Sequence, residues 1–273
     1  MRPAFLDCKH WQWLLCVSLL FAARPAWGFE TVKTLAVRIF IDEEEPRIEA
    51  LWRETLARRL DQASQILSQH SSIRFSVTKF GSWDSDDNNI KFADSLREFE
   101  RETNPFPAEL AIGFTSQYRI QRGKSNLGGT RGPMRRHILI REGSPNTQEV
   151  ERLEVLVHEL AHFLGAAHSG NPDSVMRPIL GDGKSRARAF KIKLDRPNAQ
   201  IVRLISHEMA GRHVFSMHRL SLDTKIAVRD LYATIDKSFP DDEVAKRFVA
   251  YMDKSIRATV ATRGKGGKDS RSP

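Results

Sequence analysis

Cysteine is nearly absent from this chain of 273 residues, which contains only Cys8 and Cys16. Nothing after residue 16 can therefore form a disulfide or a cysteine-based zinc finger. Aromatic RNA-binding motifs and glycine-rich phosphate loops are missing too. The longest apolar run, residues 11–23, is shorter than the roughly 20 residues that an ordinary membrane span needs. These absences exclude a disulfide framework and argue against nucleic acid as a partner.

The first 28 residues have the features of a secretory signal peptide. Two basic residues, Arg2 and Lys9, precede the apolar run, and the small residues Ala26 and Gly28 stand at both key cleavage positions. We expect residues 1–28 to be removed and the mature protein to be secreted or periplasmic, with no stable membrane span. An uncleaved N-terminal anchor is the alternative.

The chain is basic, with 43 lysines and arginines against 34 acidic residues and a net charge of +9. Removal of the signal peptide takes away three basic residues and one acidic residue, which lowers the net charge to about +7. This charge favours contact with anionic surfaces or acidic substrates. The basic residues are spread along the chain, so the charge does not indicate nucleic-acid binding.

The most informative stretch is HELAHFLGAAH, residues 158–168. On a helix, His158 and His162 lie one turn apart on the same face, so both can reach one metal ion. Glu159 lies about 100° round from His158 and is suited to act on water at the metal rather than to bind the metal. His168 reaches the same ion only if the helix stops, and Gly165 allows that stop. Three histidines leave a fourth zinc position open, which is the catalytic arrangement.

A methionine follows in the segment SVMRP, residues 174–178. The pattern HExxHxxGxxH followed by such a methionine resembles the metzincin clan of zinc endopeptidases. Ser169, after the third histidine, and Pro178, two residues after Met176, make the chain more similar to matrixins than to other branches. The resemblance is specific over residues 147–178.

This resemblance implies a zinc metalloendopeptidase with one catalytic zinc ion and a protein or peptide substrate. His158, His162 and His168 are then the ligands. Glu159 takes a proton from water and passes it to the departing amine. Gly165, Met176 and Pro178 are structural residues at the site, with Met176 as an apolar floor beneath the histidines.

The sequence departs from the matrixin pattern in two ways. The tyrosine of the matrixin specificity pocket is replaced by Leu180, which leaves pocket depth and side-chain preference open. The mature chain also lacks a thiol that could hold the zinc closed in an inhibitory propeptide. The segment between Phe29 and His158 is no longer than the catalytic fold needs, so we expect no propeptide.

Hydrophobic periodicity predicts a β-α-β unit near the start of the mature chain. Alternation predicts strands at residues 34–41 and 73–80, and apolar residues at three- and four-residue steps predict a helix between them, from 46 to 67. The two strands should then be parallel neighbours. Further elements are expected as follows: a helix at 90–102, strands at 110–114 and around 138–140, and helices near 199–211, 224–235 and 241–256.

The predicted fold class is α+β, a metzincin-like zincin. We expect a catalytic domain over residues 29–262. Its N-terminal subdomain, residues 29–165, should hold a twisted mixed sheet and the active-site helix, with Asn146 as N-cap and Glu149 completing a capping box. Its C-terminal subdomain, residues 166–262, is enlarged and mostly helical. A disordered basic tail should follow at residues 263–273.

A glycine-rich segment at residues 125–133 is the candidate substrate-binding edge strand. In metzincins an extended substrate adds to a strand at this place, and small residues would let a peptide approach closely. The candidate contact residues are Leu127, Gly128, Gly129 and Thr130. A flexible loop between two strands is an equal alternative.

Two other segments carry weaker signals. The acidic run at residues 84–87 is a candidate for structural calcium, but it lacks regular EF-hand spacing and a solvated turn is the simpler interpretation. The sequence HEMAGRH, residues 207–213, has its histidines six residues apart, which places them on different faces of a helix. We therefore interpret His207 as an ordinary surface or core histidine.

Alternatives to an active endopeptidase remain at this stage. The chain could be a zinc-site protein without proteolytic activity, acting as a binding module at an anionic surface. Hydrolysis of a denatured protein distinguishes the two, and salt-sensitive binding without turnover would favour the binding module. We expect a monomer.

Overall fold

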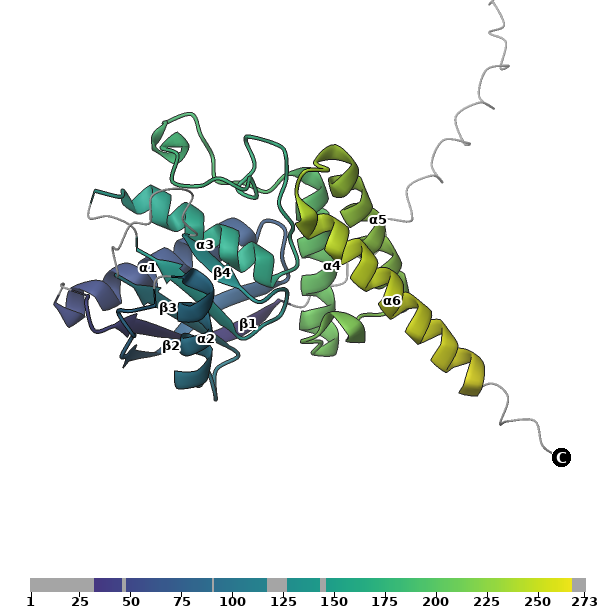
Figure 1. Cartoon of the computed structure of the whole chain (residues 1–273), viewed down its shortest axis with the longest axis horizontal. Helices are drawn as coiled ribbons and strands as arrows, with labels where there is room; N and C mark the ends of the chain where they lie inside the picture. The colour runs from purple at the N-terminus through teal and green to yellow at the C-terminus, as the bar shows by residue number, and fades with distance from the viewer. Residues whose placement is uncertain (1–31, 46–47, 90, 117–126, 143–145, 267–273) are drawn as a thin grey trace, which may run out of the picture. The chain divides into compact units, whose positions relative to one another are not determined.

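A computed structural model describes residues 32–45, 48–89, 91–116, 127–142 and 146–266 (Figure 1). The predicted signal peptide at residues 1–28 lies outside the described residues, as do residues 267–273 of the predicted tail. Within the described ranges, no helix is long and apolar enough to cross a membrane.

A five-stranded mixed sheet forms the centre of the N-terminal half (Figure 1). Four strands are parallel, and the short edge strand β4 pairs antiparallel with β5. The order across the sheet is β2-β1-β3-β5-β4. The predicted α+β class with a mixed sheet and a parallel first strand pair is therefore confirmed. The strands are β1 (Lys33–Asp42), β2 (Ile73–Trp83), β3 (Leu110–Thr115), β4 (Gly128–Thr130) and β5 (His137–Arg141).

Both faces of the central strands β1, β3 and β5 are covered, and neighbouring residues of each of these strands enter different hydrophobic clusters. In β1, Leu35, Val37 and Ile39 are fully buried in the main core. Phe40 points to the opposite face and joins a second cluster around Phe99 of helix α2 (Phe92–Glu102). Burial on both faces explains why β3 is a continuous apolar run rather than an alternating one.

Helices α1 (Glu49–Leu67) and α3 (Glu149–Phe163) pack against each other over the main core. A buried ion cluster connects them: Arg59 of α1 binds Glu142, after β5, and Glu149, in the first turn of α3. The Arg59 Nε atom lies 2.6 Å from a Glu149 carboxylate oxygen. Because Arg59 is fully buried, its two carboxylate partners are needed to offset the loss of hydration.

The predicted cap of α3 was wrong by two residues. Gln148 is the N-cap, and Glu151 completes the capping box by accepting a 2.9 Å hydrogen bond from the Gln148 backbone. The sequence offers the same three-residue spacing at Asn146 and Glu149, but Glu149 is engaged by Arg59. Both Glu149 oxygens accept hydrogen bonds from Arg59, so this carboxylate is not used in the predicted capping box.

Three helices form the C-terminal part, as predicted: α4 (Arg196–Arg212), α5 (Leu222–Ser238) and α6 (Glu243–Gly266). Helix α5 packs against both α4 and α6. Two short 3₁₀ turns, Lys184–Arg186 and Met217–Arg219, lie in the connections.

Helix α6 continues to Gly266, four residues into the stretch that the sequence predicts as the tail. Extending an existing helix adds one backbone hydrogen bond for each residue that is fixed. Residues 263–272 contain no proline, so no residue there lacks the backbone N–H group that the helix needs.

Candidate metal centre

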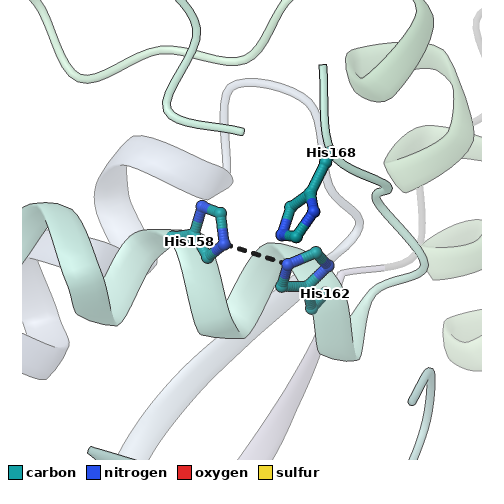
Figure 2. Close-up of side chains that lie close together, drawn as sticks. All are labelled: His158, His162 and His168. Atoms are coloured by element: carbon teal, nitrogen blue, oxygen red, sulfur yellow. Dashed lines mark hydrogen bonds between the residues drawn. The ribbon is translucent and has the colours of Figure 1, made fainter. Parts of the chain in front are cut away.

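Three histidines meet at the end of helix α3 (Figure 2). His158 and His162 lie one turn apart on the helix, with ring centroids 4.5 Å apart. His168 comes from the extended segment after the helix, and its ring lies 5.5 Å from His158 and 5.0 Å from His162. One nitrogen from each ring lies within 4.8 Å of the others. The predicted break in the helix therefore brings the three rings together.

Gly165 makes this break, as predicted. Helix α3 ends at Phe163, Leu164 is its C-cap, and Gly165 has a φ of +97°. A Cβ atom at Gly165 would lie 2.3 Å from the Ile205 Cδ1 atom of helix α4. Both the backbone conformation and the close packing of α4 therefore require glycine here.

The two helix histidines are held in one tautomer by backbone carbonyls. The Nδ1 atom of His158 lies 2.7 Å from the Val175 oxygen, and that of His162 lies 2.8 Å from the Ala166 oxygen. A carbonyl oxygen can only accept, so each Nδ1 carries the proton. The Nε2 atoms of both rings then carry lone pairs, which a metal ion needs.

Burial keeps both helix histidines neutral. Burial and then the neighbouring His162 lower the pKa of His158 well below 6.5. Burial and the neighbouring His168 lower the pKa of His162 to about 4. At pH 7 neither ring needs to lose a proton before it binds a cation.

The spacing of the rings fits one zinc ion. Two nitrogens at 2.0–2.1 Å from a tetrahedral zinc lie about 3.3 Å apart. The Nε2 atoms of His158 and His162 are 2.9 Å apart, so the side chains need to separate by only a few tenths of an ångström. Three imidazole nitrogens suit zinc better than calcium or magnesium, which prefer oxygen ligands.

Glu159 lies on α3 beside the first histidine and is buried. Its Oε2 atom has no hydrogen-bond partner among the described residues. Burial raises the pKa of this carboxyl group to about 8. A buried carboxyl group with a free oxygen and a pKa near neutral is able to accept and release a proton.

The segment around Met176 contacts His158 through the backbone. Met176 is fully buried in the main core, and its oxygen accepts a 2.9 Å hydrogen bond from the Ser169 backbone. The preceding residue, Val175, provides the carbonyl that orients His158. Pro178 is exposed at the groove described below. The role of Met176 as an apolar floor stays a prediction.

Arg177 was not singled out by the sequence, yet it connects this segment to α3. Its guanidinium lies 2.6 Å from Glu154 of the active helix and 3.0 Å from Asp182. The side chains of Arg177 and Glu154 are almost fully buried. This pair therefore fixes residues 174–178, which we call the methionine turn, against the helix that carries two of the histidines.

A groove of about 1370 Å³ runs past the three histidines and Glu159. The predicted edge strand forms one wall, and residues of the C-terminal helices and their connections form another. The lining includes Leu127, Gly128, Gly129 and Thr130 from the β4 region, Pro178 and Leu180 at and after the end of the methionine turn, and Phe215, Met217, Val244, Arg247, Phe248 and Tyr251 from the C-terminal part.

Strand β4 is confirmed as an edge strand rather than a flexible loop, and its glycines pack closely against side chains of the protein itself. A Cβ atom at Gly128 would lie 2.7 Å from the Glu159 Cγ atom. A Cβ atom at Gly129 would lie 2.7 Å from the Phe92 ring. A side chain at either glycine would therefore force a neighbouring side chain to move, while the role of these residues in binding a peptide stays a prediction.

The second His-Glu pair has a structural role. His207 is exposed, and Glu208 accepts hydrogen bonds at the start of helix α5, from the Ser221 backbone at 3.2 Å and the Thr224 hydroxyl at 2.7 Å. The candidate metal groups among the described residues do not include His207. The interpretation of His207 as an ordinary surface histidine agrees with this geometry.

The acidic run at residues 84–87 contributes only Asp87 to a cluster with Glu43 and Glu44, whose oxygens lie within 4.8 Å of one another. Burial, a hydrogen bond with Asp87 and the nearby Asp42 raise the pKa of Glu44 to about 8. At pH 7 the cluster can therefore stay together by keeping a proton on Glu44. Calcium binding here stays a prediction without a supporting motif.

Comparison with known proteins supports the motif-based resemblance. The sequence profile of the matrixin peptidases matches residues 31–199. A comparison with curated proteins gives no match. An archaemetzincin from Methanopyrus kandleri is similar in structure over 63% of this chain and 95% of its own, with a TM-score of 0.46 and 16% identity. A chaperone–substrate complex is similar over 66% of this chain and 35% of its own, with a TM-score of 0.42 and 11% identity. Because the profile covers more than half of the sequence, the chain belongs to the matrixin family of zinc metallopeptidases.

Proposed function

We propose that the protein is a zinc-dependent endopeptidase that acts outside the cytoplasm. The observation that carries this proposal is the convergence of His158, His162 and His168 beside the buried Glu159, in a groove bordered by an edge strand. The family membership makes zinc the expected ion, with these three histidines as its ligands. Zinc, when bound, polarises a peptide carbonyl and lowers the pKa of water.

Glu159 is the proposed general base. Its buried carboxyl group stands next to the first ligand in the chain, and its free oxygen lacks any protein partner among the described residues. It takes a proton from the attacking water and delivers that proton to the departing amine. Burial raises the pKa of Glu159 to about 8, and a cation held by the three histidines would favour the carboxylate form and lower this pKa.

Strand β4 is the proposed docking edge for the substrate backbone. Among the described residues it pairs with β5 alone, and we propose that the backbone groups of Gly128–Thr130 on its other side receive a peptide strand. Addition of an extended peptide to a sheet edge provides affinity through main-chain hydrogen bonds and leaves specificity to side-chain pockets. The peptide would then pass Glu159, against which Gly128 packs.

Charged and apolar side chains line both sides of the groove. Arg135 and Arg141 lie in the β4–β5 region, and Val244, Arg247 and Phe248 come from helix α6. Arginines at a cleft attract acidic segments, and the apolar side chains provide contact area. Peptides that carry both acidic and large apolar side chains are the proposed substrate class.

Residues 1–28 provide the basis for the proposed location. Their sequence resembles a secretory signal peptide, so the catalytic part would act outside the cytoplasm or in a periplasm. The measurement that checks this is the N-terminal sequence of protein recovered from the extracytoplasmic fraction, which should begin near Phe29.

The central experiment compares the wild-type protein with E159A on a denatured protein substrate. The wild type should bind one zinc ion per chain and cleave internal peptide bonds, and chelation should abolish cleavage. E159A should keep its zinc and lose turnover by about 100-fold or more. Zinc binding without cleavage by the wild type would favour a binding module instead. Full activity of E159A would contradict the role of Glu159.

A further inference from the structure

The short segment from Gly165 to His168 is held by side chains from two C-terminal helices and from the residue that precedes a third. Asn198 of α4, Tyr232 of α5 and Asp242, just before α6, each hydrogen-bond to it. Tyr232 and Asp242 lie beyond residue 199, where the match to the matrixin profile ends. The third histidine is therefore positioned by a part of the chain outside the matched region.

Asn198 and Tyr232 fix the backbone of the segment. Ala167 donates to the Asn198 Oδ1 atom at 2.9 Å, and the Asn198 amide donates to the Ala167 oxygen at 3.0 Å. The Tyr232 hydroxyl donates to the Gly165 oxygen at 2.6 Å, and both groups are buried. The path of the chain into His168 is thus fixed by hydrogen bonds within the protein.

Asp242 fixes the ring itself. Its Oδ2 atom accepts a hydrogen bond from the His168 Nδ1 atom at 2.8 Å. Its Oδ1 atom accepts from the Val244 backbone at 2.8 Å, in the first turn of α6. The two side chains are only 24% and 16% exposed. His168 is the one histidine of the three that donates to a charged acceptor, since His158 and His162 donate to carbonyls.

We propose that Asp242 is a positioning residue for the metal site. It holds His168 in the tautomer whose Nε2 atom carries a lone pair, fixes the ring orientation and increases the electron density on the ring. This inference rests on the proposed zinc site. Carboxylates that accept from metal-binding histidines typically contribute 10- to 100-fold to metal affinity. Helices α5 and α6 would then be part of the metal centre and not an appended domain.

A purely structural role for Asp242 is the competing interpretation, because the same side chain caps α6. D242S separates the two roles. Serine is a good N-cap, so the hydrogen bond to the Val244 backbone can be kept. The serine hydroxyl stands one bond from Cβ and cannot reach the His168 ring as the longer carboxylate does. D241S is the matched control, since Asp241 is exposed and the change in charge is the same.

The experiment measures zinc affinity of the full-length wild type, D242S and D241S by competition with a chromogenic chelator. D242S should lose about 10- to 100-fold in affinity, and D241S should stay within about twofold of the wild type. Equal affinity of D242S and the wild type would overturn the role of Asp242 while leaving the proposed function intact. A wild type that binds no zinc would overturn the proposed function and this inference together.

A second set of measurements distinguishes a change at the metal site from a loss of stability in D242S. The zinc-free proteins are compared by thermal unfolding, and the cobalt(II) forms are compared by their visible spectra at saturating metal. A changed cobalt spectrum in D242S, with D241S unchanged, supports an altered position of His168 whatever the unfolding temperatures are. A cobalt spectrum identical to that of the wild type would show that Asp242 acts only as a helix cap.

Discussion

Gly128 of the edge strand lies directly against Glu159 of the active helix. A Cβ atom at Gly128 would come within 2.7 Å of the Glu159 Cγ atom and 2.8 Å of its Oε1 atom. Real Cβ atoms do not approach other atoms so closely, so any side chain here must displace the glutamate or the strand. The proposed substrate edge and the proposed base are thus in contact.

The variant G128A should therefore reduce turnover without removing zinc. The added methyl group displaces Glu159 or β4, and a displacement of about 1 Å in an active site can cost about 100-fold in rate. We expect kcat to fall by about 10-fold or more, with one zinc per chain retained. Peptide kinetics and elemental analysis on the same samples measure both quantities.

G211A is the control for this variant. Gly211 lies near the end of α4, and a Cβ atom there would meet nothing within 4 Å. G211A should keep wild-type turnover. A G128A enzyme as fast as G211A would show that the contact between strand β4 and Glu159 does not matter for the reaction.

Removal of one partner from the pair formed by Arg177 and Glu154 should lower the free energy of unfolding strongly. Both side chains are nearly inaccessible, at 6% and 1% exposure. R177M leaves a buried carboxylate without its partner, which typically costs about 3–5 kcal/mol. Denaturant unfolding of the zinc-free protein measures this loss.

Two further variants test the origin of that loss. E154L/R177M removes both charges and should recover most of the stability, because no isolated buried charge remains. K246A breaks the exposed pair of Lys246 with Glu243 and should change stability by less than about 1 kcal/mol. A double variant as unstable as R177M would point to lost packing rather than an unpaired charge.

Glu208 should stabilise the fold in a pH-dependent way. Burial alone would raise its pKa, but hydrogen bonds from Ser221 and Thr224 outweigh burial and hold the pKa below 4.5. A carboxyl group with a depressed pKa in the folded state stabilises the protein above its unfolded pKa. This contribution is lost as the pH falls through the pKa that Glu208 has in the folded protein, which lies below 4.5.

E208Q should accordingly be less stable than the wild type at pH 7, and the difference should shrink in acid. Thermal unfolding across this pH range measures the difference. E243Q, at an exposed carboxylate that is 63% accessible, should show little difference at any pH. Zinc content should be unchanged in E208Q. Loss of zinc in E208Q would instead indicate that the second His-Glu pair binds metal.

Local spacing explains which features were predictable from the sequence. The periodicities of residues 34–80 are local, and the parallel β-α-β unit formed as expected. The histidines at 158 and 162 share a helix face by geometry alone, and Gly165 signals the break. Each of these inferences depends on residues within a few turns of one another.

The features that were missed depend on distant residues. Asp242 lies 74 residues from His168, and Arg59 lies 83 residues from Glu142, so no local pattern connects these pairs. The capping box of α3 was misplaced because two equivalent spacings compete locally. The reason for Gly128 requires knowing that β4 passes over Glu159. Tertiary contacts decide all of these cases.

The coordination of bound zinc tests the central claim most directly. X-ray absorption at the zinc edge should show one zinc per chain surrounded by three imidazole nitrogens at about 2.0–2.1 Å and one oxygen ligand. Replacement of any one of His158, His162 or His168 by alanine should remove one imidazole contribution or the metal itself. A zinc environment that keeps three imidazoles in each of these variants would contradict the account.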